Sequence, residues 1–351
     1  MRLHPLLKKP EVVIVSRTAV SAQPTSAEYI AAGRAVLEAA GLEIGGERVV
    51  LKPNLTTAEQ RANPDDGIST HPAFLRGLVD HLRTHGARRD RLYVLEDPLD
   101  EDHDRPRDWS RTGLPQALEG TGVKLRFPTA RTIVRRRVPD PLVHAERRGG
   151  RLAVEAGTVL INVPKLKTHG IAITTACVKN LMGVDYVCDR HYCGQAIRAA
   201  LPRMAAPGGP GLGEWATLDD HEKVQRELAK RLVDLAKVVR PALNVVEGVV
   251  GRDGTGFHRG RNFPLGVCLA GTCAVTVDAF ASWLMGFDPL KLIYLSEAAA
   301  AGLGEIDPRK IEVYTVEIGG LVRCRDAAGL RFDPAFDAIT QSREQNYDRY
   351  R

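Results

Sequence analysis

The sequence lacks the features that mark membrane and secreted proteins. No apolar run approaches the roughly 20 residues that a helix needs to cross a bilayer, and the N-terminus has no clear apolar segment before a cleavage site. We therefore expect a cytoplasmic protein that does not enter a membrane. Aromatic residues make up only 5% of the chain, so stacking platforms for single-stranded nucleic acid are scarce.

Three common catalytic motifs are also missing. There is no G-x-x-x-x-G-K-[ST] phosphate loop, no G-x-G-x-x-G after the first predicted strand, and no G-x-S-x-G elbow. A common kinase, dehydrogenase or serine hydrolase is therefore disfavoured. The glycine-rich GRDGTG (Gly251–Gly256) lacks the strand–turn–helix context of a nucleotide fingerprint, and we interpret it as a flexible turn.

Cysteines are few, and their spacing does not fit the common metal motifs. In a chain of 351 residues without a secretion signal, free thiols are expected. Two pairs share a C-x4-C spacing, which is wider than the C-x2-C of zinc ribbons and ferredoxin-type clusters. An iron–sulfur cluster is therefore disfavoured, and a divalent metal stays open. The residues that would form a metal or iron–sulfur site are Cys188, Cys193, Cys268 and Cys273, with His191 as a substitute ligand.

The charge is mildly basic, with a net value of +6. The densest basic run is Arg131–Arg151, which we interpret as a solvated surface ribbon, with a polyanion or nucleotide site as the alternative. Nucleic acid is therefore a disfavoured partner. The content of 44% hydrophobic and 26% charged residues is that of an ordinary globular protein.

Strand-like and helix-like segments alternate along the chain. This order predicts an α/β fold with a mainly parallel sheet flanked by helices, and a smaller mixed-strand insertion around residues 122–155. We expect one domain over residues 1–317 and a peripheral extension over 318–351. The alternative is that residues 1–317 form two lobes that meet near 150–160. The predicted strands are Glu11–Ser16, Arg48–Asn54, Arg91–Asp97, Gly157–Lys165, Ala242–Gly251, Pro264–Gly271 and Lys310–Glu317, and the predicted helices are Thr25–Ala40, Pro72–Gly86, Asp219–Val239, Ala274–Gly286 and Pro289–Ala301.

Polar side chains gather where the predicted strands end. Ligands of open α/β sheets bind outside the carboxyl ends of the strands, so these residues are candidates for one site. The clearest segment is VPKLKTHG (Val163–Gly170), which follows an apolar strand and is followed by KNLMG (Lys179–Gly183). The predicted substrate-binding residues are Lys52, Asn54, Lys165, Thr168, Lys179 and Asn180.

The concentration of cationic groups predicts an anionic partner, either a carboxylate or a phosphate. We expect His169, with His71 or Asp253, to move a proton. Lys167 is the fourth residue that we expect to be catalytic. Carboxylates at other strand ends could instead hold a divalent cation. The candidates for a metal ligand, none of them favoured, are Cys188, Cys193, His191, Asp97 and Glu247.

The motifs resemble the domain of unknown function 362 family, in the family's order over residues 11–317. The resemblance rests on VLKPNL (Val50–Leu55), STHP (Ser69–Pro72), VLINVPKLKTHG (Val159–Gly170), KNLMG, VVEGVVGRDGTG (Val245–Gly256), TVDAFASWLMGFDP (Thr276–Pro289) and GLGEID (Gly302–Asp307). It implies an α/β fold and a shared site that includes Asp278, but no general activity. Some relatives carry a ferredoxin-like segment with two C-x2-C-x2-C runs, which is missing here, so their redox association does not carry over.

These observations favour an enzyme of small-molecule, specialised biosynthetic metabolism that acts on an anionic substrate. Acid–base chemistry of the lyase, isomerase or cyclase type fits the predicted residues. A metal-dependent or iron–sulfur redox protein is the first alternative, and a nucleic-acid-binding module is the second. A homodimer stays open.

Overall fold

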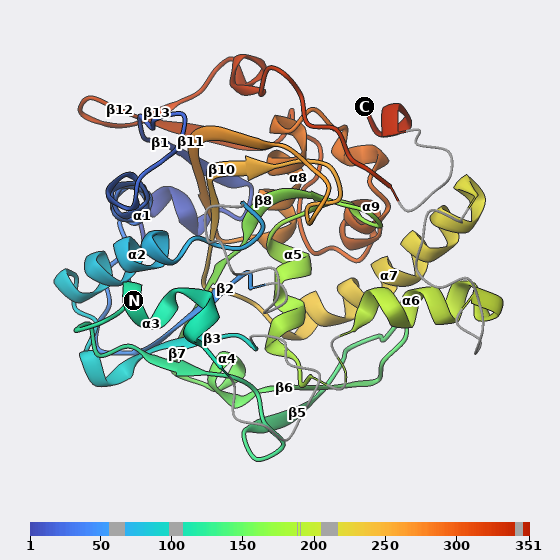
Figure 1. Cartoon of the computed structure of the whole chain (residues 1–351), viewed down its shortest axis with the longest axis horizontal. Helices are drawn as coiled ribbons and strands as arrows, with labels where there is room; N and C mark the ends of the chain where they lie inside the picture. The colour runs from blue at the N-terminus through green and yellow to red at the C-terminus, as the bar shows by residue number, and fades with distance from the viewer. Residues whose placement is uncertain (56–66, 98–107, 188, 190, 205–216, 341–346) are drawn as a thin grey trace.

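The computed structural model describes residues 1–55, 67–97, 108–187, 189, 191–204, 217–340 and 347–351. They form one large sheet with helices on both faces (Figure 1). The strand order is β13-β12-β1-β11-β10-β7-β2-β3-β4, with β8 beside β10 and β9 beside β8. The strands are β1 (Val12–Arg17), β2 (Arg48–Pro53), β3 (Leu92–Leu95), β4 (Lys124–Arg126), β7 (Thr158–Val163), β8 (Lys165–His169), β9 (Ile173–Thr175), β10 (Leu243–Arg252), β11 (Asn262–Gly271), β12 (Glu312–Glu317) and β13 (Gly320–Arg323).

Most strand pairs of this sheet are parallel, as predicted for an α/β protein. Strands β10, β7, β2, β3 and β4 run parallel in that order, while β11 runs antiparallel between β1 and β10. A separate antiparallel pair, β5 (Ile133–Arg137) and β6 (Glu146–Gly150), forms the smaller insertion. The predicted fold class is therefore confirmed. One strand of the insertion region, β4, joins the edge of the main sheet.

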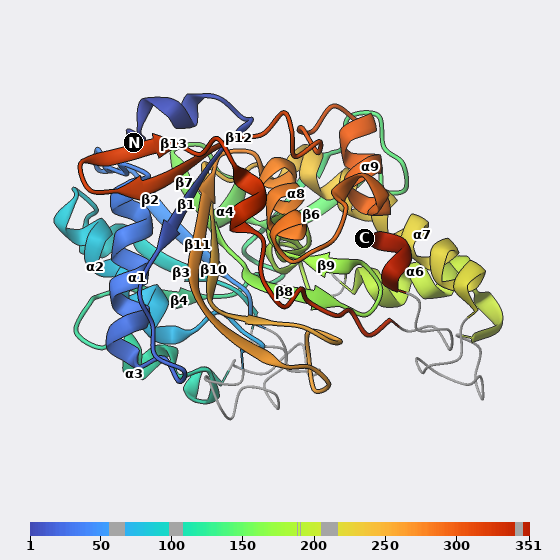
Figure 2. The ribbon, with the colours of Figure 1, turned by 90° about the horizontal axis from the view of Figure 1, so that it is seen from above.

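Helices form the two outer layers (Figures 1 and 2). One face is covered by α1, α2 and α3, and the other by α5, α8 and α9 with α7 beyond them. Helix α6 packs against α7, and α4 precedes β7. The helices are α1 (Ser26–Ala39), α2 (Pro72–Thr84), α3 (Leu114–Ala117), α4 (Arg151–Val154), α5 (Cys177–Asn180), α6 (Tyr192–Ala200), α7 (Leu218–Val238), α8 (Ala274–Leu284) and α9 (Ile293–Ala300).

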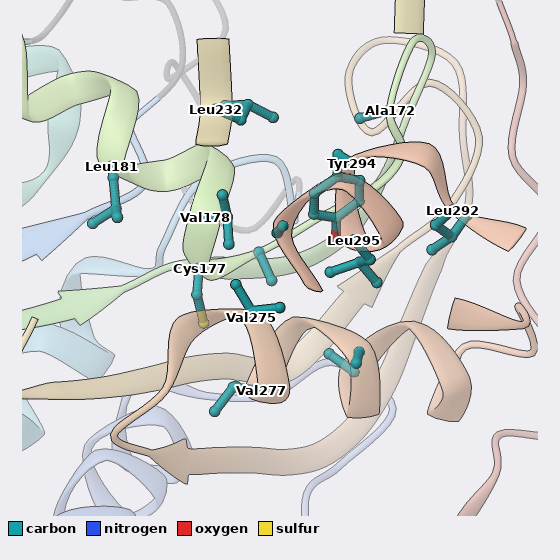
Figure 3. Packing of buried hydrophobic residues seen from close by; sticks show 14 of the residues in the cluster. Ala172, Cys177, Val178, Leu181, Leu232, Val275, Val277, Leu292, Tyr294 and Leu295 are labelled. Atoms are coloured by element: carbon teal, nitrogen blue, oxygen red, sulfur yellow. The ribbon is translucent and has the colours of Figure 1, made fainter. Parts of the chain in front are cut away.

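The sheet separates two hydrophobic cores because successive strand residues point to opposite faces. In β1, Val12 and Ile14 belong to the core under α1 and α2, whereas Val13 and Val15 belong to the core under α5, α8 and α9. Figure 3 shows the second core, in which residues of α5, α8 and α9 pack together. Both faces being buried explains why these strands read as continuous apolar runs.

The segment VPKLKTHG, which the sequence places where a predicted strand ends, continues as a second strand. Strand β7 ends at Val163, and the chain continues after Pro164 into β8, which pairs with β10 in parallel and with β9 in antiparallel orientation. Proline has no N–H to donate to a ladder, so it ends one strand and allows the next to begin in a new direction. Lys165, Lys167 and His169 thus occupy alternate positions of a buried strand.

The C-terminal region packs onto the domain. Strand β13 pairs with β12, and Phe336 and Tyr350 are almost completely buried. The Phe336 ring stacks on Phe263 of β11 with 4.5 Å between centroids. Among the described residues, no helix is both long and apolar enough to span a bilayer.

Helices α1 and α2 pack closely because each presents a glycine to the other. A Cβ atom on Gly77 would lie 2.2 Å from the carbonyl oxygen of Ile30, and one on Gly33 would lie 2.5 Å from that of Phe74. Neither gap accepts a methyl group, so the two glycines set the distance between the helices.

We predict that Gly77→Ala destabilises the protein by about 1–3 kcal/mol, because the methyl group must push the helices apart. Helix propensity alone would give the opposite sign, since alanine is favoured over glycine by about 1 kcal/mol. Urea denaturation checks the prediction. Gly194→Ala on α6 is the control, because its nearest neighbour is a flexible arginine nitrogen at 3.5 Å, and it should be neutral or stabilising. Equal or greater stability of the Gly77 variant would contradict this account of the packing.

Candidate functional site

A cavity of about 710 Å³ opens between the segment after β2, the end of β8, α5, α6 and the loop after β10. Four of the predicted catalytic and substrate-binding residues line it: Asn54, His169, Lys179 and Asn180. Its apolar wall is formed by Leu55, Ile171, Met182, Ile197 and Phe257. A mostly apolar cavity with a few converging polar groups is typical of a small-molecule site.

His169 is held in one tautomer. Its Nδ1 atom accepts the backbone N–H groups of Ile171 at 3.0 Å and Ala172 at 3.1 Å, so the imidazole proton lies on Nε2. Burial lowers the pKa of His169 well below its ordinary value, and the charges of Lys179 and Lys167 lower it further. The ring is therefore a neutral hydrogen-bond donor in this structure, and Nε2 lies 4.0 Å from the sulfur of Cys193.

Two cationic side chains of the cavity wall lack a carboxylate partner within the described part of the chain. Lys179 comes from α5 and Arg198 from α6, and neither forms an ion pair or hydrogen bond among the described residues. Of the other lysines of the predicted cluster, Lys52 and Lys165 are paired with glutamates, and Lys167 donates to a backbone carbonyl oxygen. The charges of Lys179 and Arg198 are therefore the ones available to an anionic ligand.

The floor of the cavity is a buried ion pair. Lys52 Nζ of β2 donates to Glu96 Oε2 at 2.5 Å and to the carbonyl oxygen of Pro53 at 2.8 Å. Lys52 is fully buried, whereas Glu96 lines the cavity. Gly183 lies against this pair, since a Cβ atom there would be 2.4 Å from Glu96 Oε1. Lys52 therefore holds a carboxylate of the protein, not of a ligand.

A chain of amides fixes α5 to the sheet. Asn180 donates to Lys52 O at 3.0 Å and to Asn162 Oδ1 at 2.8 Å, and Asn162 donates to Asn244 Oδ1 at 2.9 Å. All three amides are buried. Asn54 differs, because its buried Oδ1 atom has no hydrogen-bond partner and it lines the cavity.

Lys165 lies on the opposite face of the sheet from Lys52. It pairs with Glu247 at 2.6 Å, beside Tyr29 of α1, and Glu247 also accepts the backbone N–H of His71 at 3.3 Å. His71 stacks on Tyr29 and caps α2 through Nδ1. Lys165 and His71 are thus predicted site residues that the structure places in the α1–α2 layer, away from the cavity.

Three further predicted residues make contacts within the fold. Lys167 Nζ donates to the carbonyl oxygen of Ile68 at 2.7 Å, and Thr168 donates to that of Gly254 at 2.8 Å. Asp253 accepts from Arg261, with the closest contact at 2.6 Å. None of the three lines the cavity.

The metal-ligand candidates do not converge. Cys188 lies outside the described residues, His191 and Cys193 line the cavity, Asp97 follows Glu96 along the chain, and Glu247 is paired with Lys165. No group of three or more His, Cys, Asp or Glu side chains in the described ranges is placed to hold a metal ion. Cys268 lies in β11 and Cys273 precedes α8, and neither lines the cavity.

The basic run over Arg131–Arg151 folds into the β5–β6 pair, where several arginines meet carboxylates. Arg135 pairs with Glu146, Arg148 with Asp189, and the buried Arg147 with Asp185. These pairs reduce the charge available to a polyanion.

The residue pattern missed α6, which supplies Cys193 and Arg198 to the cavity. Its sequence, YCGQAIRAA, begins directly after the CDRH segment, which draws attention to metal ligation instead. The apolar Tyr192, Ala196 and Ile197 lie at helical spacing on one buried face and could have revealed the helix.

Asp278, at a motif position, anchors α5 to α8. Its carboxylate accepts the backbone N–H groups of Cys177 and Val178, and it is completely buried. Burial raises the pKa of Asp278 to about 7, although the two N–H groups act in the opposite direction. It belongs to the core beneath the cavity wall, not to the wall itself.

The comparisons with known proteins give a family and two distant similarities. Residues 49–283 match the family model described as "Domain of unknown function (DUF362)". The chain is 22% identical over 278 residues to a thylakoid-associated protein of Synechocystis sp., covering 74% of this chain and 69% of that protein. A crystal structure of a Thermotoga maritima protein is similar at 9% identity and a TM-score of 0.38, covering 67% of this chain and 52% of that chain.

We predict that Lys52→Met destabilises the protein by roughly 3–5 kcal/mol, because it leaves the Glu96 carboxylate without its buried partner. The double variant Lys52→Met with Glu96→Gln should recover part of this loss, since no charge is then left unpaired. Chemical denaturation of the single and double variants gives the coupling energy. Additive effects would show that the two side chains do not interact.

Asp278 predicts a pH dependence of stability. Its folded-state pKa is raised to about 7 from an ordinary 3.8, so its contribution is largest at low pH and is lost as the pH rises to 7. The free energy of unfolding should fall by about 3 kcal/mol more between pH 5 and pH 8 than in Asp278→Asn. Urea denaturation at both pH values measures this difference, with the exposed Asp219→Asn as control. Identical pH slopes for wild type and Asp278→Asn would contradict it.

Proposed function

The chain belongs to the domain of unknown function 362 family, and from this premise we propose that it is an enzyme of small-molecule metabolism that binds an anionic substrate in the cavity between α5 and α6. The family name assigns no activity, so the proposal rests on the cavity. The observation that carries it is the pair of cations, Lys179 and Arg198, that line the cavity without a carboxylate partner among the described residues.

The neutral imidazole supports acid–base chemistry in which charge develops on an oxygen. The Nε2–H group of His169 is held toward the cavity by the two backbone bonds to Nδ1. A fixed donor in a buried site stabilises an oxyanion such as an enolate. We propose that His169 has this role, in place of the general base that the sequence favoured.

Glu96 is the group that we propose as proton acceptor. It is a carboxylate on the cavity wall, and its position is fixed by Lys52 and by the backbone N–H of Asp97, which lies 2.8 Å from Oε1. Removal of a proton next to a carboxylate, with stabilisation of the enolate that forms, is a step of lyases and isomerases. This assignment agrees with the expected class of reaction.

We also propose that the protein is cytoplasmic. Cys177, Cys193, Cys268, Cys273 and Cys324 are free thiols, which agrees with a reducing compartment such as the cytoplasm.

We predict that Lys179→Gln weakens the binding of small anions by about 10–100-fold, because a charge-assisted hydrogen bond contributes roughly 1.5–3 kcal/mol. The measurement is calorimetric titration with a panel of small carboxylates and phosphates, beginning with inorganic phosphate, oxalate and citrate. Lys223→Gln, at an exposed lysine of α7, is the matched control and should bind normally. If the wild type binds no member of the panel, or if the Lys179 variant binds as tightly, the proposal is wrong.

Two substitutions separate the roles of His169. Gln can still present an N–H group to the cavity, so His169→Gln should retain more turnover or ligand affinity than His169→Ala, by about tenfold. A general base would be lost equally in both variants. An equal loss of turnover or affinity in the two variants would therefore contradict the donor role and support His169 as a general base.

A further inference from the structure

We propose that Cys193 is a nucleophilic thiolate of the cavity, and that the ligand carries an electrophilic carbonyl carbon next to its anionic group. The inference deepens the proposed function and rests on it for the anionic group. It assigns a reacting atom, and it narrows the ligand to aldehydes, ketones or acyl compounds that bear a carboxylate or phosphate.

The position of Cys193 distinguishes it from the buried cysteines. It lies in the first turn of the nine-residue helix α6, it is partly exposed, and it lines the cavity. The N-terminal N–H groups of a helix favour a negative charge such as a thiolate. Cys177 and Cys268 are fully buried instead, and burial raises the pKa of both thiols. These two are inert structural residues.

His169 provides a second and independent observation. His169 has an exposed fraction of 9%, and its Nε2 atom lies 4.0 Å from the Sγ atom of Cys193, which lines the same cavity. Because Nδ1 already accepts two backbone N–H groups, Nε2 can donate toward the sulfur but cannot take its proton. The imidazole therefore stabilises the charged form of the thiol, which differs from a cysteine–histidine pair in which histidine is the base.

The remaining polar groups of the cavity fit a ligand of this class. Lys179 and Arg198 supply positive charge for its carboxylate or phosphate, without ion pairs among the described residues. Asn54 supplies a buried Oδ1 atom that lacks a hydrogen-bond partner. A ligand with an anionic group and a hydroxyl or amine next to the carbonyl would satisfy all three groups.

The step needs no oxidant or other reactant. The sulfur forms a bond to the carbonyl carbon, the C=O π bond breaks, and its electron pair moves to the oxygen. The resulting oxyanion is stabilised by the ammonium of Lys179 and the Nε2–H of His169, which line the same cavity. Collapse of the oxyanion releases the thiolate again, so the step is reversible.

Alkylation of the full chain tests the inference. Iodoacetamide and the anionic iodoacetate both form an S–C bond and release iodide, and peptide mass spectrometry follows each cysteine separately. At pH 7 we expect Cys193 to react at least about tenfold faster than the partly exposed Cys324. We also expect the ratio of iodoacetate to iodoacetamide rates at Cys193 to fall in Lys179→Gln, because that substitution removes a cation that lines the cavity.

Substitutions of Lys179 and His169 show what causes fast alkylation. Lys179→Gln should lower the iodoacetate rate at Cys193 by about tenfold, whereas Lys223→Gln should leave it unchanged. His169→Ala should lower the rates of both reagents, and His169→Gln should restore part of them. Equal rates at Cys193 and Cys324, or a Cys193 rate that does not change in the Lys179 and His169 variants, would overturn the inference.

Anion binding separates this inference from the proposed function. Slow alkylation of Cys193 in a protein that binds anions overturns the thiolate alone. Fast alkylation in a protein that binds no anion of the panel overturns the anionic substrate and leaves the thiolate supported.

Discussion

The buried ion pair between Lys52 and Glu96 is the interaction on which the cavity depends. A lysine on β2 would be costly to bury without a partner, and a glutamate on the cavity wall would repel an anionic ligand without neutralisation. The pair solves both problems, and Asn180 ties it to α5 through Lys52. Helix α5, which carries Lys179, is therefore held in position by its contacts with the ion pair.

The same solution occurs on the other face of the sheet, where Lys165 pairs with Glu247. The two pairs divide the lysines of the motifs into structural and available charges. Lys52 and Lys165 pair with glutamates near strand ends, whereas Lys179 has no carboxylate partner among the described residues. A family motif can therefore contain residues that hold the fold and residues that face the cavity at neighbouring positions, as Lys179 and Asn180 do.

The α/β class and most of the elements could be predicted from the sequence, because buried strands read as apolar runs and α1 and α2 begin at clear capping residues. The gathering of Asn54, His169, Lys179 and Asn180 could also be predicted, since strand ends of one sheet share an edge. The partners of the lysines could not, because strand alternation decides the face and Pro164 changes the direction of the chain. The tautomer of His169 depends on the backbone of Ile171 and Ala172, which residue types do not reveal.

The fixed imidazole has a consequence for how this protein would respond to its surroundings. Histidine is usually the side chain that senses acidity between pH 5 and pH 8. Here the ring is held neutral by burial and by nearby positive charge, so a fall in cellular pH would leave its hydrogen-bonding pattern unchanged. The Nε2–H donor of His169 would then stay in place through acid stress, and any change in what it binds would follow the ionisation of the ligand.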